Sequence, residues 1–285
     1  MAKKDTDAVE NGKKWRRGSR LAAIALELSA RPGQLFTLSE LAERYECAKS
    51  TLSEDLTALR EPLYEAGMGS IETLPGAAGG VRFQPWKPLR FHRKAVAQCC
   101  QELQNPNRIM PGDFLYTVDV LSQPSMLRPL GTLLAQIFAC EGFDAVLTIE
   151  AKGVPIGLMT AEALGVPLAI ARKENRATEG SVVTLNYQTT SRSVLQSMSL
   201  PRRALAAGQR VLIVDDFVKG GGTVSALCDM MDEFSCEVAG IASLIAAPDV
   251  RAASGMPVKA PMILHGVQRA ARKIDLRMAD WLNED

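Results

Sequence analysis

The chain opens on a polar stretch that gives way to helical periodicity. Residues 1–18 hold few large apolar side chains and carry clustered lysines and arginines, which predicts a flexible basic arm. Apolar side chains between Leu21 and Leu28 then recur at the spacing of one helix face. We expect this helix to be capped by Ser19 and stopped by the Arg-Pro-Gly run at 31–33.

Two more helices and a hairpin follow within 90 residues. Thr37 and Glu40 have the spacing of a capping box at the start of a second helix. A third helix is expected from Ser50 to about Gly67. Two β-like runs, 70–74 and 81–84, flank a glycine-rich tip and predict a hairpin. Three helices followed by a hairpin are typical of a winged helix, here residues 19–85.

Strands and helices alternate in the rest of the chain. A connector at 85–111 contains its own helix. Beyond it, strands are expected at 145–149, 166–171, 182–187, 211–214 and 238–245, with helices at 156–164 and about 223–234. This alternation predicts an α/β fold whose mainly parallel sheet is covered on both faces. We take 86–285 as connector plus this second domain, in which ligands would bind at the carboxyl ends of the strands.

Composition and charge argue against several classes of function. The net charge is +1, so any nucleic-acid contact must be local. Six cysteines without a C-x-x-C pair and only two histidines argue against a zinc site and for reduced thiols. The N-terminus lacks the apolar core of a secretory signal, and no apolar run is long enough to span a bilayer. We therefore expect a soluble cytoplasmic protein without a membrane partner.

The strongest chemical signal is the run from Val211 to Thr223, VLIVDDFVKGGGT. Four aliphatic residues predict a buried strand, and two carboxylates, Asp215 and Asp216, stand at its carboxyl end. Three glycines then allow backbone N–H groups to converge, and Thr223 adds a hydroxyl at a helix N-terminus, where anions are favoured. Carboxylates accept hydrogen bonds from ribose hydroxyls, directly or through Mg²⁺. The segment therefore predicts a phosphosugar site rather than a plain strand-to-helix turn.

This run resembles the phosphoribosyl pyrophosphate (PRPP) loop of type I phosphoribosyltransferases. The resemblance implies that Asp215 and Asp216 contact the ribose and that the loop binds the 5′-phosphate, with Mg²⁺ accompanying the ligand. It also implies pyrophosphate contacts after two other strands. The implied ligand residues are Ala151, Lys152, Gly153, Arg172, Lys173, Asp215, Asp216, Phe217, Lys219, Gly220, Gly221, Gly222 and Thr223.

The chain as a whole resembles the purine operon repressor family of Gram-positive bacteria. The similarity runs through 42–56, 75–81, 108–112, 173–187 and 196–200, and it ends near residue 245. It implies a homodimer that binds double-stranded operator DNA upstream of purine biosynthesis genes and is released by PRPP. It further implies no transferase activity, and guanosine tetraphosphate as a second effector at the same site.

The residues give mixed support for DNA binding. Residues 37–65 contain three basic and seven acidic side chains, so a winged helix that binds protein stays open as an alternative. Against it, polar residues open the third helix, where base and phosphate contacts are usually made, although the hydroxyls there would serve equally as caps. The candidate DNA-binding residues are Lys14, Arg16, Arg17, Arg20, Lys49, Ser50, Thr51, Ser53 and Arg82.

An enzyme remains the main alternative. An active xanthine or adenine phosphoribosyltransferase with an accessory N-terminal domain would share the PRPP loop. We find no residue to name as general acid or base, and we assign no catalytic or metal-ligating residue. A ribose-phosphate-binding scaffold without DNA contact is a third hypothesis. The sequence does not distinguish a repressor from an activator.

Overall fold

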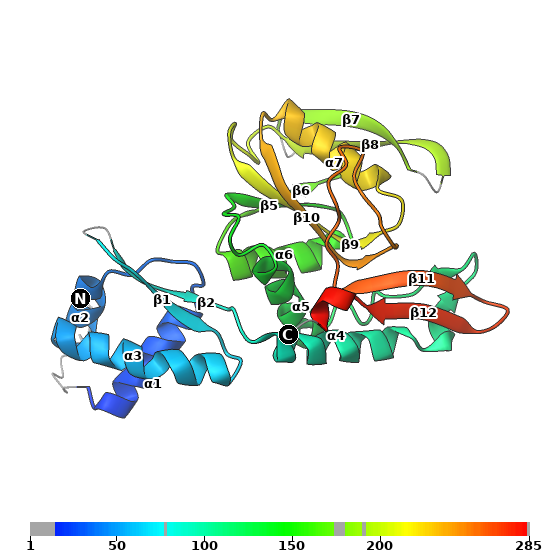
Figure 1. Cartoon of the computed structure of the whole chain (residues 1–285). Helices are drawn as coiled ribbons and strands as arrows, with labels where there is room; N and C mark the ends of the chain where they lie inside the picture. The colour runs from blue at the N-terminus through cyan, green and yellow to red at the C-terminus, as the bar shows by residue number, and fades with distance from the viewer. Residues whose placement is uncertain (1–14, 77–78, 174–179, 190–191, 284–285) are drawn as a thin grey trace, which may run out of the picture.

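The computed structural model describes residues 15–76, 79–173, 180–189 and 192–283 (Figure 1). The N-terminal part consists of three helices and a hairpin, in the predicted order. Their bounds are α1 Arg17–Ser29, α2 Leu38–Arg44, α3 Lys49–Glu65, β1 Ser70–Leu74 and β2 Gly80–Gln84. The hairpin is antiparallel, and an isolated bridge between Phe36 and Val81 adds the segment before α2 to it.

Helix starts in this part agree only partly with the sequence. Thr37 forms the predicted capping box, with its hydroxyl accepting from the Glu40 N–H and the Glu40 carboxylate accepting from the Thr37 N–H. The prediction for Ser19 is wrong, because α1 already begins at Arg17 and Ser19 lies inside its first turn. The N-cap position is instead occupied by Arg16, which makes no side-chain cap hydrogen bond.

A connector joins this part to the α/β body. Residues 85–88 lead into α4 (Leu89–Leu103), which is followed by η1 Pro106–Arg108, β3 Ile109–Met110, β4 Phe114–Leu115 and α5 Pro124–Gln136. Gln136 binds both backbone groups of Lys87, at 3.1 and 3.0 Å. His92 Nε2 lies 2.8 Å from the same Gln136 oxygen, and burial lowers the pKa of this histidine to about 4. A neutral imidazole thus helps to fix the connector to α5.

The body is built on one six-stranded sheet of order β12-β11-β10-β9-β5-β6. All neighbours are parallel except β11 and β12, which form an antiparallel pair. The strands of the sheet are β5 Ala145–Ile149, β6 Leu168–Ala171, β9 Arg210–Val218, β10 Glu237–Ala246, β11 Met262–Gln268 and β12 Lys273–Met278. The remaining elements are α6 Gly153–Leu164, β7 Val182–Thr189, β8 Arg192–Pro201, α7 Gly222–Glu233 and η3 Asp280–Leu282.

Strand residues alternate between two cores, one on each face of the sheet. Leu212 and Val214 point to a core shared with α4, α5 and α6. Val211 and Ile213 point to the opposite core, which is closed by α7 and the β7–β8 ribbon. Both faces are therefore buried, which explains why the central strands read as continuous apolar runs. The predicted strand at 182–187 exists as β7, but it pairs only with β8, outside the main sheet.

The N-terminal part touches the body at the end of α6. Gly165 caps this helix in the left-handed region, and a Cβ at Gly165 would lie 2.5 Å from the Pro32 carbonyl oxygen. A Cβ at Gly33 would likewise lie 3.0 Å from the Leu164 oxygen. The loop between α1 and α2 thus lies directly against the C-terminus of α6. Within the described ranges, no helix is both long and apolar enough to cross a membrane.

Candidate functional site

The first candidate site forms where the loops after β5 and β9 meet. These strands are parallel neighbours, with Ala145 beside Val211 and Leu147 beside Ile213, so their carboxyl ends share one edge of the sheet. The loop after β5 passes so close to β9 that a Cβ at Gly153 would lie 2.9 Å from Asp215 Oδ1. The same Cβ would lie 2.4 Å from Thr148 Oγ1. Glycine at 153 is therefore required for this loop to approach the carboxylate.

Asp215 and Asp216 form a tight carboxylate pair at the end of β9. The Asp216 N–H donates to Asp215 Oδ1 at 2.9 Å, and Asp215 is only 6% exposed. Burial raises the pKa of Asp215 well above its ordinary value, and the neighbouring charge of Asp216 raises it further. Burial also raises the pKa of Asp216. Two carboxylates that are difficult to ionise together favour a ligand that donates hydrogen bonds or brings a cation.

The raised pKa values predict how the pair affects stability. A group whose pKa is raised on folding stabilises the fold most below its unfolded value, 3.8 for Asp, and that stabilisation is lost as pH rises through the folded value. Asp215→Asn removes the ionisable group but keeps an oxygen at Oδ1. We therefore expect this variant to unfold at a higher temperature than the wild type at about pH 8, with the difference shrinking toward about pH 4. Differential scanning fluorimetry of both proteins between about pH 4 and pH 8 measures this difference in unfolding temperature.

Comparing Asp215→Asn with the wild type separates the effect of Asp215 on the unfolding temperature from that of the other carboxylates. Asp119, for example, has a lowered pKa because Arg108 hydrogen bonds to it, which gives the opposite pH dependence in both proteins. A difference in unfolding temperature that is constant with pH would show that Asp215 is an ordinary solvated carboxylate.

The glycine-rich turn follows the carboxylates and opens α7. Gly221 adopts φ +73°, and a Cβ there would lie 2.4 Å from the Arg251 carbonyl oxygen. The helix begins at Gly222 and has no acidic side chain in its first turn. Lys219 and Gly220 are exposed, and Thr223 is half-buried. A helix N-terminus with a neighbouring exposed lysine and a hydroxyl can bind a phosphate group.

Basic side chains from two other loops act on the carboxylate pair. The charge of Lys152 lowers the pKa of Asp216, and the charge of Lys173 lowers that of Asp215, both against the effect of burial. Arg172 instead places Nη1 3.2 Å from Glu150, and its backbone pairs with Ser199. The charges of both lysines therefore act on the acidic pair, whereas Arg172 braces the loop after β5 through Glu150.

Sequence reasoning missed two residues at this site. Tyr187 on β7 is buried, its hydroxyl bonds Gln196 at 2.9 Å, and a hydrogen bond to Thr223 lowers its pKa against the dominant effect of burial. Glu150 accepts from Arg172 and from the Lys173 N–H. The only available signal was that Tyr187 ends an apolar run, which does not predict that β7 folds over the glycine-rich turn. Residues 174–179, within the run 173–187 that resembles the purine operon repressors, lie outside the described residues.

The second candidate site is the start of α3. Lys49, Ser50 and Ser53 are exposed, and Thr51 is half-buried. The N-cap is Ala48, without a side-chain hydrogen bond, so none of these hydroxyls serves as the cap. Arg16 and Arg17 are also exposed, whereas Lys14 lies outside the described residues. Arg82 on β2 is half-buried and pairs with Glu72 at 2.7 Å.

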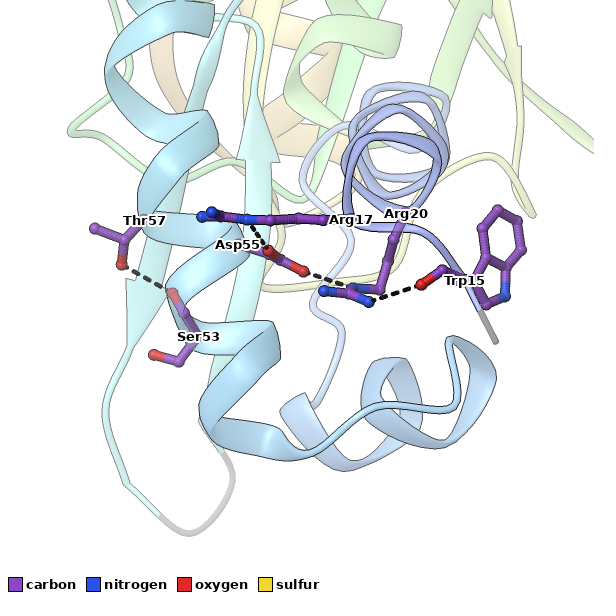
Figure 2. A network of polar contacts seen from close by, with 6 residues as sticks. All are labelled: Trp15, Arg17, Arg20, Ser53, Asp55 and Thr57. Atoms are coloured by element: carbon purple, nitrogen blue, oxygen red, sulfur yellow. Dashed lines mark hydrogen bonds and ion pairs between the residues drawn. The ribbon is translucent and has the colours of Figure 1, made fainter. Parts of the chain in front are cut away.

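The structure corrects the prediction for Arg20. Its side chain is 8% exposed and places Nε 2.6 Å from Asp55 Oδ2 in α3 (Figure 2). Because a guanidinium buried against a carboxylate cannot reach a phosphate, Arg20 is a structural residue of the α1–α3 junction. The same contact neutralises Asp55, and Glu40 and Glu65 are also engaged, in the capping box and with Arg90. Asp55 is therefore removed from the exposed negative charge of this domain, whereas Glu40 and Glu65 are hydrogen-bonded but stay exposed.

Two family models match the chain. The model described as the bacterial purine repressor, N-terminal, covers residues 16–85, and that of the phosphoribosyl transferase domain covers 117–265. The adenine phosphoribosyltransferase of Thermoanaerobacter pseudethanolicus superposes with a TM-score of 0.50 at 21% identity, over 58% of this chain and 97% of the enzyme. That likeness shows the fold of the body alone.

Relatives that match over most of the chain are transcription regulators. The purine biosynthesis transcriptional repressor PurR of Bacillus subtilis is 42% identical over 83% of both chains. The purine biosynthesis transcriptional activator PurR of Lactococcus lactis is 36% identical over 94% of this chain and 99% of its own length. Xanthine phosphoribosyltransferase of Lactobacillus delbrueckii is 29% identical, over only 51% of this chain and 79% of the enzyme. The chain therefore belongs to the PurR family of purine biosynthesis transcription regulators.

Proposed function

We propose that this chain binds operator DNA of purine biosynthesis genes through its N-terminal domain, and that PRPP bound to the body weakens this binding. The observation that carries the proposal is the carboxylate pair Asp215–Asp216 beside the glycine-rich start of α7, in one chain with the purine repressor domain. We further propose that it acts in the cytoplasm as a homodimer, since paired half-sites in DNA suit a two-fold symmetric reader.

Each part of PRPP has a partner of suitable chemistry at the site. The ribose hydroxyls would donate to Asp215 and Asp216, whose burial strengthens such bonds. The 5′-phosphate would bind the N–H groups between Lys219 and Thr223. The pyrophosphate would bind the loop 151–153 and the two lysines, Lys152 and Lys173. Mg²⁺ fits the same place, because hard carboxylate oxygens suit it and it would add positive charge beside two acids.

The body would bind PRPP without transferring its ribose. This proposal is supported by the relatives that match over most of the chain, which are named as regulators. Guanosine tetraphosphate, which also carries a pyrophosphate and a ribose, is proposed as a competitor for this site.

Helix α6 offers a direct connection between the two sites. It begins at Gly153, in the loop that approaches Asp215, and it ends against Pro32 of the N-terminal domain. A helix transmits displacement along its axis with little deformation, so a shift of the loop on ligand binding would reach the α1–α2 loop. The contact involves backbone atoms on both sides, which suits a connection that does not depend on a particular side-chain pair.

Calorimetry together with a turnover assay tests the proposal. We expect PRPP to bind in the presence of Mg²⁺, guanosine tetraphosphate to compete with it, and no pyrophosphate to be released when adenine, guanine, hypoxanthine or xanthine is added. Release of pyrophosphate with one of these bases would establish the phosphoribosyltransferase alternative. Absence of PRPP binding would reject the effector proposal altogether.

A further inference from the structure

Two arginines of α1 converge on one buried carboxylate of α3. Asp55 is 1% exposed, and its two oxygens accept from different residues (Figure 2). Arg20 Nε lies 2.6 Å from Oδ2, and Arg17 Nε lies 3.3 Å from Oδ1. Arg20 alone would neutralise the carboxylate, so the second arginine leaves the cluster with one positive charge in excess.

The two arginines differ in exposure. The Arg20 side chain is 8% exposed and also donates from Nη1 to the Trp15 carbonyl at 3.3 Å. The Arg17 side chain is 65% exposed, although its Nε is bound to Asp55. A guanidinium presents five N–H donors in a rigid fork, so Nε can be fixed by a carboxylate while the terminal nitrogens stay accessible. Arg17 thus has a defined orientation without being enclosed.

Trp15, which precedes α1, is held in place beside this cluster. The Trp15 ring packs edge-on against Tyr45, with 5.4 Å between the ring centres, and Tyr45 in turn bonds Glu27 at 2.7 Å. Trp15 is therefore held against Tyr45, and Arg17 is held against Asp55 of α3, two residues after the candidate contact residue Ser53. Burial of a carboxylate is unfavourable unless it is paired, and a single arginine would satisfy it. The additional, exposed arginine needs another explanation.

We propose that Asp55 is a positioning residue for DNA binding, which fixes Arg17 so that its terminal nitrogens bind a phosphate beside the groove that receives α3. This inference rests on the proposed DNA-binding function. A phosphate held by an oriented guanidinium is bound through two donors, whereas a lysine offers a single mobile charge. Asp55 itself never contacts the DNA.

This proposal and a simple charge argument predict opposite effects of removing Asp55. On charge alone, loss of an acidic side chain next to DNA strengthens binding, because repulsion of the phosphates decreases. If Asp55 positions Arg17, its loss weakens binding although the net charge becomes more positive. The sign of the change in DNA affinity therefore separates the two explanations.

The main test uses Arg17→Lys, with Arg60→Lys as its matched control. Both changes keep the charge, both residues are exposed, and of the two only Arg17 is bound to Asp55, whereas Arg60 donates to Thr73. Fluorescence anisotropy on a duplex from a purine-operon promoter is expected to show about a tenfold loss of affinity for Arg17→Lys and less than about a twofold loss for Arg60→Lys. Both variants are expected to unfold at the wild-type temperature, because the Asp55–Arg20 pair is unchanged.

Asp55→Asn and the double variant Asp55→Asn with Arg17→Lys complete a double-mutant cycle. Asp55→Asn is expected to weaken DNA binding, and Arg17→Lys is expected to add less than about a twofold effect in its presence, since the oriented contact is already lost. If Asp55→Asn does not fold, the two lysine variants still decide the matter. Equal affinities for wild type and Arg17→Lys, or tighter binding by folded Asp55→Asn, would overturn the inference. If the wild type itself bound no DNA, the proposed function would fail first, and this inference with it.

Discussion

Replacing Asp215 and Asp216 together by asparagine is expected to leave DNA binding at the wild-type level and to abolish its response to PRPP. Each carboxylate would accept a charge-assisted hydrogen bond from a ribose hydroxyl, and such bonds contribute roughly 1.5–3 kcal/mol each. Loss of both hydrogen bonds therefore lowers the affinity for PRPP by about 100-fold or more. Calorimetry measures the loss of ligand affinity, and anisotropy on promoter DNA measures the loss of response.

The matched control is the double variant Asp229→Asn and Asp232→Asn. These two carboxylates are exposed on α7, within the same domain, so the variant has the same change in net charge without touching the site. It should bind PRPP and respond to it as the wild type does. A normal response in the Asp215–Asp216 variant would mean that the effector binds elsewhere.

Gly221→Ala is expected to have the second large effect, on both stability and ligand binding. Alanine at φ +73° is strained by roughly 1–2 kcal/mol, and its Cβ would lie 2.4 Å from the Arg251 carbonyl oxygen, a backbone atom with little freedom to move. The turn must therefore shift, which misplaces the N–H groups at the start of α7. We expect an unfolding temperature several degrees lower and weaker binding of PRPP.

Gly208→Ala separates the strain from the steric contact. Gly208 has φ +82°, but a Cβ there would meet no atom within 4 Å. This control should show the modest destabilisation of a left-handed alanine and unchanged PRPP affinity. If both variants behaved alike, the close approach of the turn to Arg251 would have no consequence.

The sequence was most informative where local chemistry and strand order act together. The run 211–223 predicted a strand, a carboxylate pair and a glycine-rich helix start, and the structure shows these elements as β9, the acidic pair and α7. The resemblance also implied a ligand contact in the loop after β5, and this loop does lie beside the pair, because the carboxyl ends of neighbouring parallel strands meet at one edge. The strand and the helix start follow from local chemistry and need little information about tertiary packing.

The wrong prediction for Arg20 has a different cause. Arg20 lies one helical turn before Ile24 and two before Leu28, on the buried face of α1, and Asp55 lies beside Leu52 and Leu56 on the buried face of α3. Two opposite charges on core faces are a signal for a buried ion pair. Charge alone places Arg20 among the candidate DNA-binding residues, whereas the helix periodicity places it on the buried face.

Strand pairings between segments far apart in the chain were not predicted. Strands β11 and β12 were not predicted, because β11 joins the sheet only after a long connection that follows β10. The partner of β7 was likewise missed, and with it the position of Tyr187 over the glycine-rich turn. These features depend on contacts between segments far apart in the chain, which periodicity does not encode.

Relatives named as a repressor and as an activator match this chain to similar degrees, at 42% and 36% identity. Similarity to the family therefore does not set the direction of regulation. Linkage requires that if PRPP weakens DNA binding by some factor, DNA weakens PRPP binding by the same factor.

The most direct measurement is fluorescence anisotropy of the full-length protein on labelled purine-operon promoter DNA, titrated with PRPP in the presence of Mg²⁺. We expect tight binding without PRPP and progressive release as PRPP is added, with no release of DNA from the Asp215–Asp216 variant. Tight binding that PRPP leaves unchanged would contradict the account.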